Sequence, residues 1–130
     1  MEKEEYDKLW AQYEHNTNLY KFYFDLFIKI HLFYYGITGG IIAFYFTNNS
    51  IEFIKYSLLL PILVSLALMI LFWIGAGMIK VIGDEILLLV EKLDLEAYPD
   101  TSMLTIGFKL SSFFYAVIIC LMICLLFIKI

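Results

Sequence analysis

Few side chains in this sequence are able to do chemistry, and the most suggestive group lies between positions 25 and 38. Its members are Asp25, Lys29, His31, Tyr34 and Thr38. Asp25 and Lys29 are four residues apart, so they can form an ion pair on one face of a helix. The other three lie inside an apolar stretch, where a polar side chain is costly against hydrocarbon and useful against a protein partner or a wet cavity.

Two interpretations of these residues stay open. In the first, copies of the chain surround a pore, with Asp25, Lys29 and His31 at its cytoplasmic mouth and Tyr34 and Thr38 deeper in the membrane. In the second, the lysine stretches its ammonium group to the membrane surface, and the tyrosines close ordinary contacts between helices.

Motifs for catalysis or metal binding are absent from the sequence. It contains no CxxC pair, no glycine-rich phosphate loop and no nucleophile–base pair at a recognisable spacing. His15 and His31 lack a cluster of acidic or cysteine residues at the spacing of metal ligands. Cys120 and Cys124 lie deep in an apolar stretch and are interpreted as small apolar residues. We therefore expect neither an enzyme nor a bound cofactor or metal.

The composition indicates that lipid is part of the solvent of this chain. Hydrophobic residues make up 62% of the 130 positions and charged residues only 17%, whereas a soluble domain has about 45–50% and about 25%. The chain is one domain at most, and a soluble domain of this size buries only roughly two-thirds of its surface. The net charge of −4 also excludes a nucleic-acid binder driven by charge.

Three apolar stretches are long enough to cross a bilayer, whose hydrocarbon core of about 30 Å needs roughly 20 helical residues. They cover residues 26–47, 58–82 and 104–128. The predicted fold is an all-α membrane protein with three transmembrane helices. A cytoplasmic helix over residues 4–25 precedes them, and the second span continues as a cytoplasmic helix over residues 83–98. Ser65, Ser111 and Ser112 are expected to bond to the backbone of their own helices.

The positions of the lysines predict the orientation. All nine basic residues are lysines, and seven of them lie at or beyond the span ends on the side of the N-terminus, against Lys55 and Lys129 on the other side. Basic residues accumulate on the cytoplasmic side of a membrane. The N-terminus is therefore predicted in the cytoplasm and the C-terminus outside the inner (plasma) membrane. The acidic start is unlike the basic start of a signal peptide, so we expect the first span to be retained.

A heptad pattern runs from the polar N-terminal segment into the first span. Its positions are Tyr6, Trp10, Tyr13, Thr17, Tyr20, Phe24, Phe27, His31, Tyr34, Thr38, Ile41 and Tyr45. Unbroken spacing of this kind favours one helix from about residue 4 to residue 47. The alternative is a break at residues 15–18, with Asn18 capping a new helix.

Small residues form a second face on the spans, which lets helices approach closely in lipid. On the first span they are Gly36, Gly40, Ala43 and Thr47, and on the second they are Gly75, Ala76, Gly77 and Gly83. We assign the small faces to packing within the chain and the heptad face to contacts between chains of a homo-oligomer. The residues named for that oligomer seam are Tyr6, Trp10, Tyr13, Tyr20 and Phe24. In the alternative, both faces pack inside one subunit.

Several short motifs carry a resemblance to a known type of protein. They are Trp10-x-x-Tyr13, Asn-Leu-Tyr-Lys-Phe-Tyr at 18–23, Tyr-Tyr-Gly-Ile-Thr-Gly at 34–39, Lys-Tyr-Ser-Leu-Leu-Leu-Pro at 55–61 and Leu-Glu-Ala-Tyr-Pro-Asp at 95–100. With this layout the chain resembles small multi-span proteins of the bacterial inner membrane. Its architecture is similar to that of the membrane effectors of anti-phage defence systems. The resemblance implies a protein that disrupts the membrane when a sensor signals infection, and it carries over no catalytic or ligand-binding residue.

The predicted function is an oligomeric inner-membrane pore or membrane-disrupting effector that is gated from the cytoplasmic side. A partner protein or a small ligand on residues 4–21 or 84–96 would shift the helices along the heptad face. The alternative is a non-conducting membrane scaffold, an accessory subunit or an immunity protein. The expected partners are the lipid bilayer, further copies of the chain, and a cytoplasmic protein or small ligand, with no nucleic acid.

Overall fold

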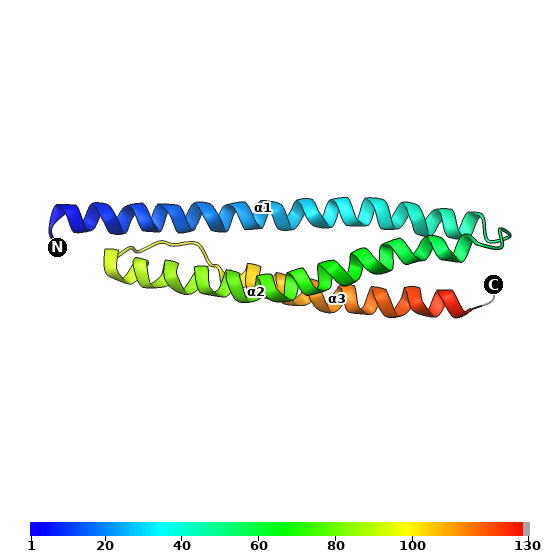
Figure 1. Cartoon of the computed structure of the whole chain (residues 1–130). Helices are drawn as coiled ribbons and strands as arrows, with labels where there is room; N and C mark the ends of the chain where they lie inside the picture. The colour runs from blue at the N-terminus through cyan, green and yellow to red at the C-terminus, as the bar shows by residue number, and fades with distance from the viewer. Residues whose placement is uncertain (129–130) are drawn as a thin grey trace.

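A computed structural model describes residues 1–128, which form three long α-helices and one short 3-10 helix. The elements are α1 (Lys3–Thr47), η1 (Ile54–Leu58), α2 (Leu59–Leu93) and α3 (Ser102–Phe127). Helix α1 runs the length of the molecule, and α2 returns alongside it before α3 reverses direction again (Figure 1). The described residues contain no strand, so the predicted all-α class is confirmed.

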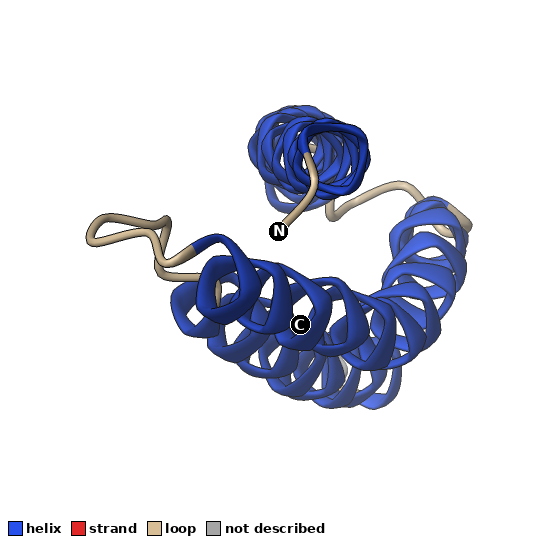
Figure 2. Cartoon of the chain, turned by 90° about the vertical axis from the view of Figure 1, so that its left-hand side faces the viewer, coloured by secondary structure: helices blue, strands red, loops and turns tan. Residues whose placement is uncertain are grey.

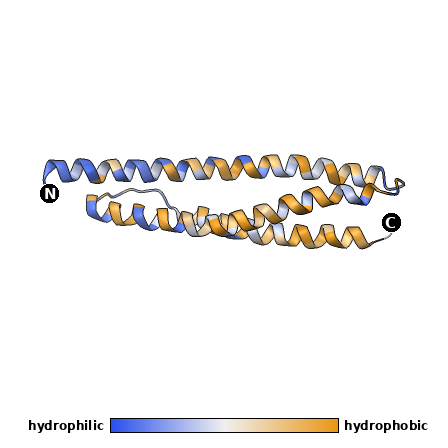
Figure 3. Cartoon of the chain, viewed as in Figure 1, coloured by the Kyte–Doolittle hydropathy of each residue, from blue (hydrophilic) through white to orange (hydrophobic). Residues whose placement is uncertain are grey.

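All three long helices are apolar enough and long enough to cross a membrane. Figure 3 shows that the N-terminal part of α1 is hydrophilic, that the last turns of α2 are mixed, and that the apolar residues gather where the three helices run side by side. Large apolar side chains point outward: Phe33, Leu63, Trp73 and Phe113 are each at least 63% exposed. Long apolar helices with apolar outer faces make this a multi-pass membrane protein.

Helix α1 is continuous over 45 residues. The predicted continuous helix is therefore confirmed, and the alternative break at residues 15–18 is not found. No proline interrupts this segment, and its first glycine is Gly36. At 1.5 Å per residue, α1 is roughly 68 Å long, about twice the thickness of a bilayer core. A substantial part of α1 therefore lies outside the apolar span.

Helix α2 continues beyond the predicted second span and ends at Leu93, not at residue 98 as predicted. Asp94 adopts the left-handed conformation with a φ of 53°, and the Leu95 N–H donates to the Val90 carbonyl at 3.1 Å. A left-handed residue followed by such a bond terminates a helix. The predicted extension is too long because the chain already turns at Asp94, before Pro99.

Asp100 fixes the start of α3. Its Oδ1 accepts hydrogen bonds from the Ser102 N–H at 3.0 Å and from the Ser102 hydroxyl at 2.7 Å. These bonds favour the carboxylate form and so lower the pKa of Asp100. The first turn of α3 thereby gains a partner for one of the N–H groups that a helix start leaves free.

The core lies where all three helices meet. Its buried residues are Tyr34 from α1, Phe72, Ala76 and Ile79 from α2, and Leu104, Phe108 and Tyr115 from α3. The end view in Figure 2 shows the helix that carries the N-terminus set apart from the other two. Aromatic rings fill this gap, because Phe27 of α1 lies 5.6 Å from Phe72 and 5.3 Å from Phe108 between ring centroids. Nearer the N-terminus, Tyr13, Tyr20 and Tyr23 pack on Ile86 and its neighbours in α2.

The contact between α2 and α3 yields a first prediction, on Gly75 and Gly77. A Cβ added at Gly75 would lie 2.7 Å from the Phe108 ring, whereas one at Gly77 would meet nothing within 4 Å. Alanine raises helix propensity equally at both positions, so only the contact with Phe108 separates them. We expect Gly75→Ala to lower the free energy of unfolding by about 1–3 kcal/mol and Gly77→Ala to leave it equal or higher. Thermal unfolding in detergent, followed by circular dichroism, measures both, and equal midpoints would contradict the packing described.

Candidate functional site

Asp25 and Lys29 form the predicted ion pair at the start of the first span. The Lys29 Nζ lies 2.6 Å from the Asp25 Oδ2, and both side chains are more than 60% exposed. Exposed pairs of this spacing add only about 0.3–0.5 kcal/mol to a helix. Their importance lies in their position, since they occupy the outward side of α1.

His31 links α1 to α3. Its Nδ1 lies 2.7 Å from the Phe27 carbonyl oxygen and its Nε2 lies 3.0 Å from the Ser111 Oγ. Because a carbonyl can only accept, the Nδ1–H donates to Phe27, and the Nε2 forms a second hydrogen bond with the Ser111 hydroxyl. The rings of Phe72 and Tyr115 lie 5.0 Å and 5.8 Å from the imidazole. His31 therefore acts in this structure as a helix–helix contact.

Tyr34 links α1 to α2 and is only 2% exposed. Its hydroxyl lies 2.6 Å from the Ser65 Oγ, which itself donates to the Pro61 carbonyl at 2.6 Å. The tyrosine hydroxyl is thus the donor to Ser65. Thr38, one helical turn further along α1, is also buried. The two side chains predicted to lie deep in a pore face α2 of their own chain.

Further hydrogen bonds join the helices to one another and to the loop before α3. The Ser112 hydroxyl donates to the Met69 carbonyl at 2.9 Å, and the Tyr45 hydroxyl donates to the Leu125 carbonyl at 3.4 Å. Near the N-terminal side, the Tyr20 hydroxyl donates to the Asp100 carbonyl at 3.2 Å. Burial and the negative charge of Asp100 raise the pKa of Tyr20.

Three serines of the spans were expected to form hydrogen bonds with the backbone of their own helices, and only one of them does. Ser65 does bond to its own helix, through the Pro61 carbonyl. Ser111 and Ser112 instead bond to His31 and to Met69 on other helices. The expectation of bonds within the helix is wrong there because both side chains face a neighbouring helix. The hydroxyl of Tyr115 is buried without a hydrogen-bond partner in the described part of the chain.

The assignment of the two faces of α1 made from the sequence is wrong for packing within the chain. The membrane part of the heptad face packs within the chain, through Phe27, His31 and Tyr34. The small face points outward, since a Cβ at Gly36 or Gly40 would meet nothing within 4 Å. Ala43 and Thr47 on that face are exposed as well. Large aromatic side chains can bridge the wide space between α1 and the α2–α3 pair, whereas small residues need close backbones.

The residues named for an oligomer seam divide into two groups. Tyr13 and Tyr20 are partly buried against α2 of the same chain. Tyr6, Trp10 and Phe24 are between 42% and 47% exposed, and the rings of Tyr6 and Trp10 stack with centroids 6.5 Å apart. The exposed aromatic residues lie on the hydrophilic part of α1 and at its entry into the apolar span.

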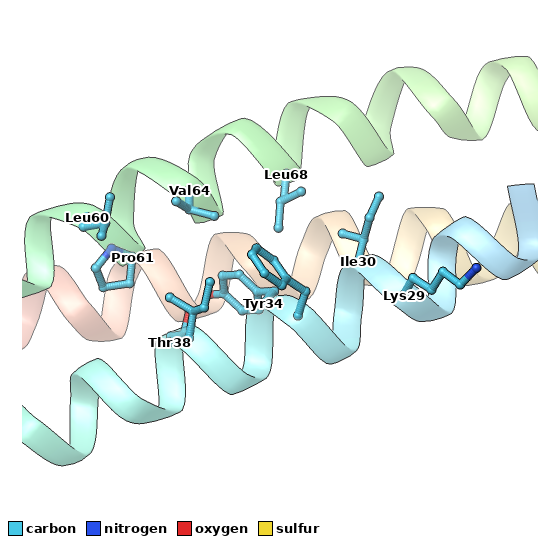
Figure 4. Close-up of a pocket in the computed structure, with 10 residues that line it drawn as sticks. Lys29, Ile30, Tyr34, Thr38, Leu60, Pro61, Val64 and Leu68 are labelled. Carbon is cyan, nitrogen blue, oxygen red and sulfur yellow. The ribbon is translucent and has the colours of Figure 1, made fainter.

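Two cavities lie between α1 and α2. Figure 4 shows the first, of about 630 Å³, with Ile30, Tyr34 and Thr38 of α1 facing Pro61 and Leu68 of α2. Its lining is apolar apart from Lys29, Tyr34 and Thr38. The second cavity, of about 660 Å³, is nearer the N-terminus and has a polar lining. Its residues are Ala11, Gln12, His15, Asn16, Glu85, Leu88, Leu89 and Lys92.

The second cavity brings polar side chains of α1 and α2 together. It offers two amides, an imidazole, a carboxylate and an ammonium group within one opening. In the described residues, no group of three or more His, Cys, Asp or Glu side chains is placed to hold a metal ion. No protein-family model, curated protein or solved structure matches this chain.

The Tyr34–Ser65 bond yields a second prediction. Tyr34→Phe removes a buried hydrogen bond between helices, which is worth about 0.6–1.7 kcal/mol in membrane proteins. Tyr35→Phe is the matched control, because Tyr35 is the next residue and half of it is exposed. We expect Tyr34→Phe to lower the free energy of unfolding in detergent by that amount and Tyr35→Phe to change it by less than about 0.5 kcal/mol. Equal effects would show that the bond does not hold α1 against α2.

Proposed function

We propose that the protein is a self-associating membrane subunit that presents a cytoplasmic docking arm, in the manner of a scaffold or accessory subunit. The arm consists of the part of α1 that precedes the apolar span and the part of α2 that follows it. The observation that carries the proposal is the outward small face of α1.

The lysines support a cytoplasmic N-terminus in the inner membrane. Lys29, Lys80 and Lys109 belong to three different helices, and each lies near the same end of the apolar region. That end also carries the lysines of the arm, whereas Lys55 lies in η1 at the other end. The excess of basic residues on one side is typical of the cytoplasmic face.

The outer face of α1 supports self-association. Gly36, Gly40 and Ala43 are exposed there, and no part of the described chain covers the two glycines. A small face gains little from lipid but allows a second helix to pack closely against it. By helical spacing, Asp25 and Lys29 lie on the same side of α1. An acid next to a base is self-complementary in a twofold contact between identical surfaces.

The arm supports the docking role. It leaves the apolar region as two neighbouring helices, with the 660 Å³ polar cavity between them. Near the start of α1, the stacked rings of Tyr6 and Trp10 are exposed, and exposed aromatic side chains are frequent anchors of protein interfaces. A cytoplasmic partner protein or a small ligand would bind there.

A pore or membrane-disrupting effector is the second candidate, and the position of the Asp25–Lys29 pair favours it. In a ring closed through the outer face of α1, these pairs from all copies would converge at the cytoplasmic mouth. The lining would then continue through small residues, because Tyr34 and Thr38 are buried within the chain. The layout shared with anti-phage membrane effectors supports the same candidate.

Cysteine crosslinking tests the self-association. In a background with Cys120→Ala and Cys124→Ala, we expect Gly40→Cys to give a disulfide-linked dimer when isolated membranes are oxidised, because the outer faces of two α1 helices meet. Leu63→Cys is the matched control, since Leu63 lies exposed on α2. Dimers formed equally by both variants, or by neither, would contradict an interface on the small face of α1.

Membrane potential separates the two candidates. A scaffold whose polar span residues bond within one chain offers no path for ions, so we expect no depolarisation after induced expression, read with a voltage-sensitive dye. Depolarisation that is lost in Asp25→Asn/Lys29→Gln would instead establish the pore. The matched control is Glu4→Gln/Lys8→Gln, which removes the other i, i+4 ion pair of α1 outside the apolar span.

A further inference from the structure

A polar cavity of about 450 Å³ lies at the membrane boundary between the end of the second span and the start of α3. The charged and hydroxyl side chains that line it are Lys80, Asp84, Tyr98, Asp100, Thr101, Ser102, Thr105 and Lys109. The two lysines come from different helices. Among the described residues, only Lys8 and Lys29 lie within ion-pair distance of a carboxylate. Lys80 and Lys109 therefore leave two positive charges open in one cavity.

The two acidic residues lie on the water side of these lysines. Asp84 is one helical turn further along α2 than Lys80, in the direction that leaves the membrane. Asp100 precedes α3, and its Oδ1 already accepts both hydrogen bonds from Ser102. The charges are thus separated along the groove, with the acids toward water and the lysines toward lipid.

An apolar cavity of about 390 Å³ continues the same groove deeper into the membrane region. Its lining includes Met69 and Trp73 of α2 and Phe113 and Ala116 of α3, and Lys109 lines it as well. Trp73 and Lys80 are seven residues apart and therefore share one face of α2. On α3, Phe113 is one turn from Lys109 on the same face. The polar and apolar cavities are accordingly two parts of one groove between α2 and α3, joined at Lys109.

We propose that this groove binds an anionic phospholipid. The headgroup phosphate lies between the ammonium groups of Lys80 and Lys109, and one acyl chain lies along Trp73 and Phe113. Basic pockets between transmembrane helices on the cytoplasmic side are typical sites for such headgroups. A free phosphate would use only the polar part of the groove, and a neutral lipid only the apolar part. An anionic lipid uses both.

The larger apolar cavity beside Tyr34 lacks this combination. Its one charged residue is Lys29, which is already paired with Asp25 at 2.6 Å. Charge therefore distinguishes the α2–α3 groove from the α1–α2 cavity as the lipid site. The inference is independent of the docking arm and of self-association through α1.

Fluorescence quenching of Trp73 tests the lipid site. The chain has two tryptophans, so Trp10→Phe leaves Trp73 as the sole reporter. This variant is placed in phosphatidylcholine vesicles that contain increasing fractions of brominated phosphatidylglycerol or of brominated phosphatidylcholine. We expect brominated phosphatidylglycerol to reach half-maximal quenching at a lipid fraction roughly fivefold or more lower than brominated phosphatidylcholine does. Fivefold is about the gain in affinity for an anionic lipid that one lysine near the membrane surface provides. Equal fractions would overturn the proposal.

Matched variants assign the preference to the groove. Lys80→Gln/Lys109→Gln should abolish the difference between the two lipids, and each single substitution should reduce it. Lys21→Gln/Lys29→Gln removes the same charge from α1 on the same side of the membrane and should leave the preference intact. Loss of the preference in this control as well would overturn the proposal in favour of general surface charge. Displacement by an excess of free glycerol phosphate would overturn it in favour of a soluble anion.

Discussion

The structure depends on one constraint: a polar group inside the hydrocarbon region has no water to bond and must find its partner within the protein. His31 bonds to Ser111, Tyr34 bonds to Ser65, and Ser112 bonds to the Met69 carbonyl. Together these bonds join α1 to α3, α1 to α2, and α3 to α2. Helices in lipid gain no hydrophobic drive to associate, so these bonds and the aromatic packing around Phe72 and Phe108 give the three helices their fixed arrangement. Tyr115 is an exception, since its buried hydroxyl lacks a partner among the described residues while its ring stacks on Phe72.

The same constraint determines which faces of α1 remain free. Tyrosine, histidine and phenylalanine side chains are large. Because they fill the space between α1 and the other two helices, the backbone of α1 lies at a distance from α2 and α3. The wide spacing leaves the apolar cavity of about 630 Å³ beside Tyr34. Because the aromatic face is directed inward, the opposite face with Gly36, Gly40 and Ala43 is directed outward. The small face of α1 is therefore free because the polar and aromatic side chains of this helix point toward α2 and α3.

The sequence was sufficient to predict the three long helices, but not which face of each helix packs against another helix. The apolar runs placed three spans, the unbroken heptad pattern gave the continuous α1, and the spacing of Asp25 and Lys29 gave their ion pair. Periodicity shows which residues share a face, but it contains no information on what covers that face. For this reason the sequence did not show that the heptad face of α1 packs within the chain and that its small face points outward. Likewise, the end of α2 depends on the left-handed backbone of Asp94, and Pro99 was the more obvious stop signal.

Lys29, Lys80 and Lys109 lie near the same end of the apolar region, but their surroundings differ. A lysine near a span end can always extend to the membrane surface. In the sequence, Lys29 and Lys80 each also have an aspartate four residues away, Asp25 and Asp84, a spacing that predicts an ion pair for both. In the structure, Lys29 forms an ion pair with Asp25 on its own helix, and both side chains are exposed. Lys80 and Lys109 have no carboxylate within ion-pair distance in the described chain and face one cavity from two helices. The proposed anionic headgroup would supply the partner that neither lysine has in an ion pair.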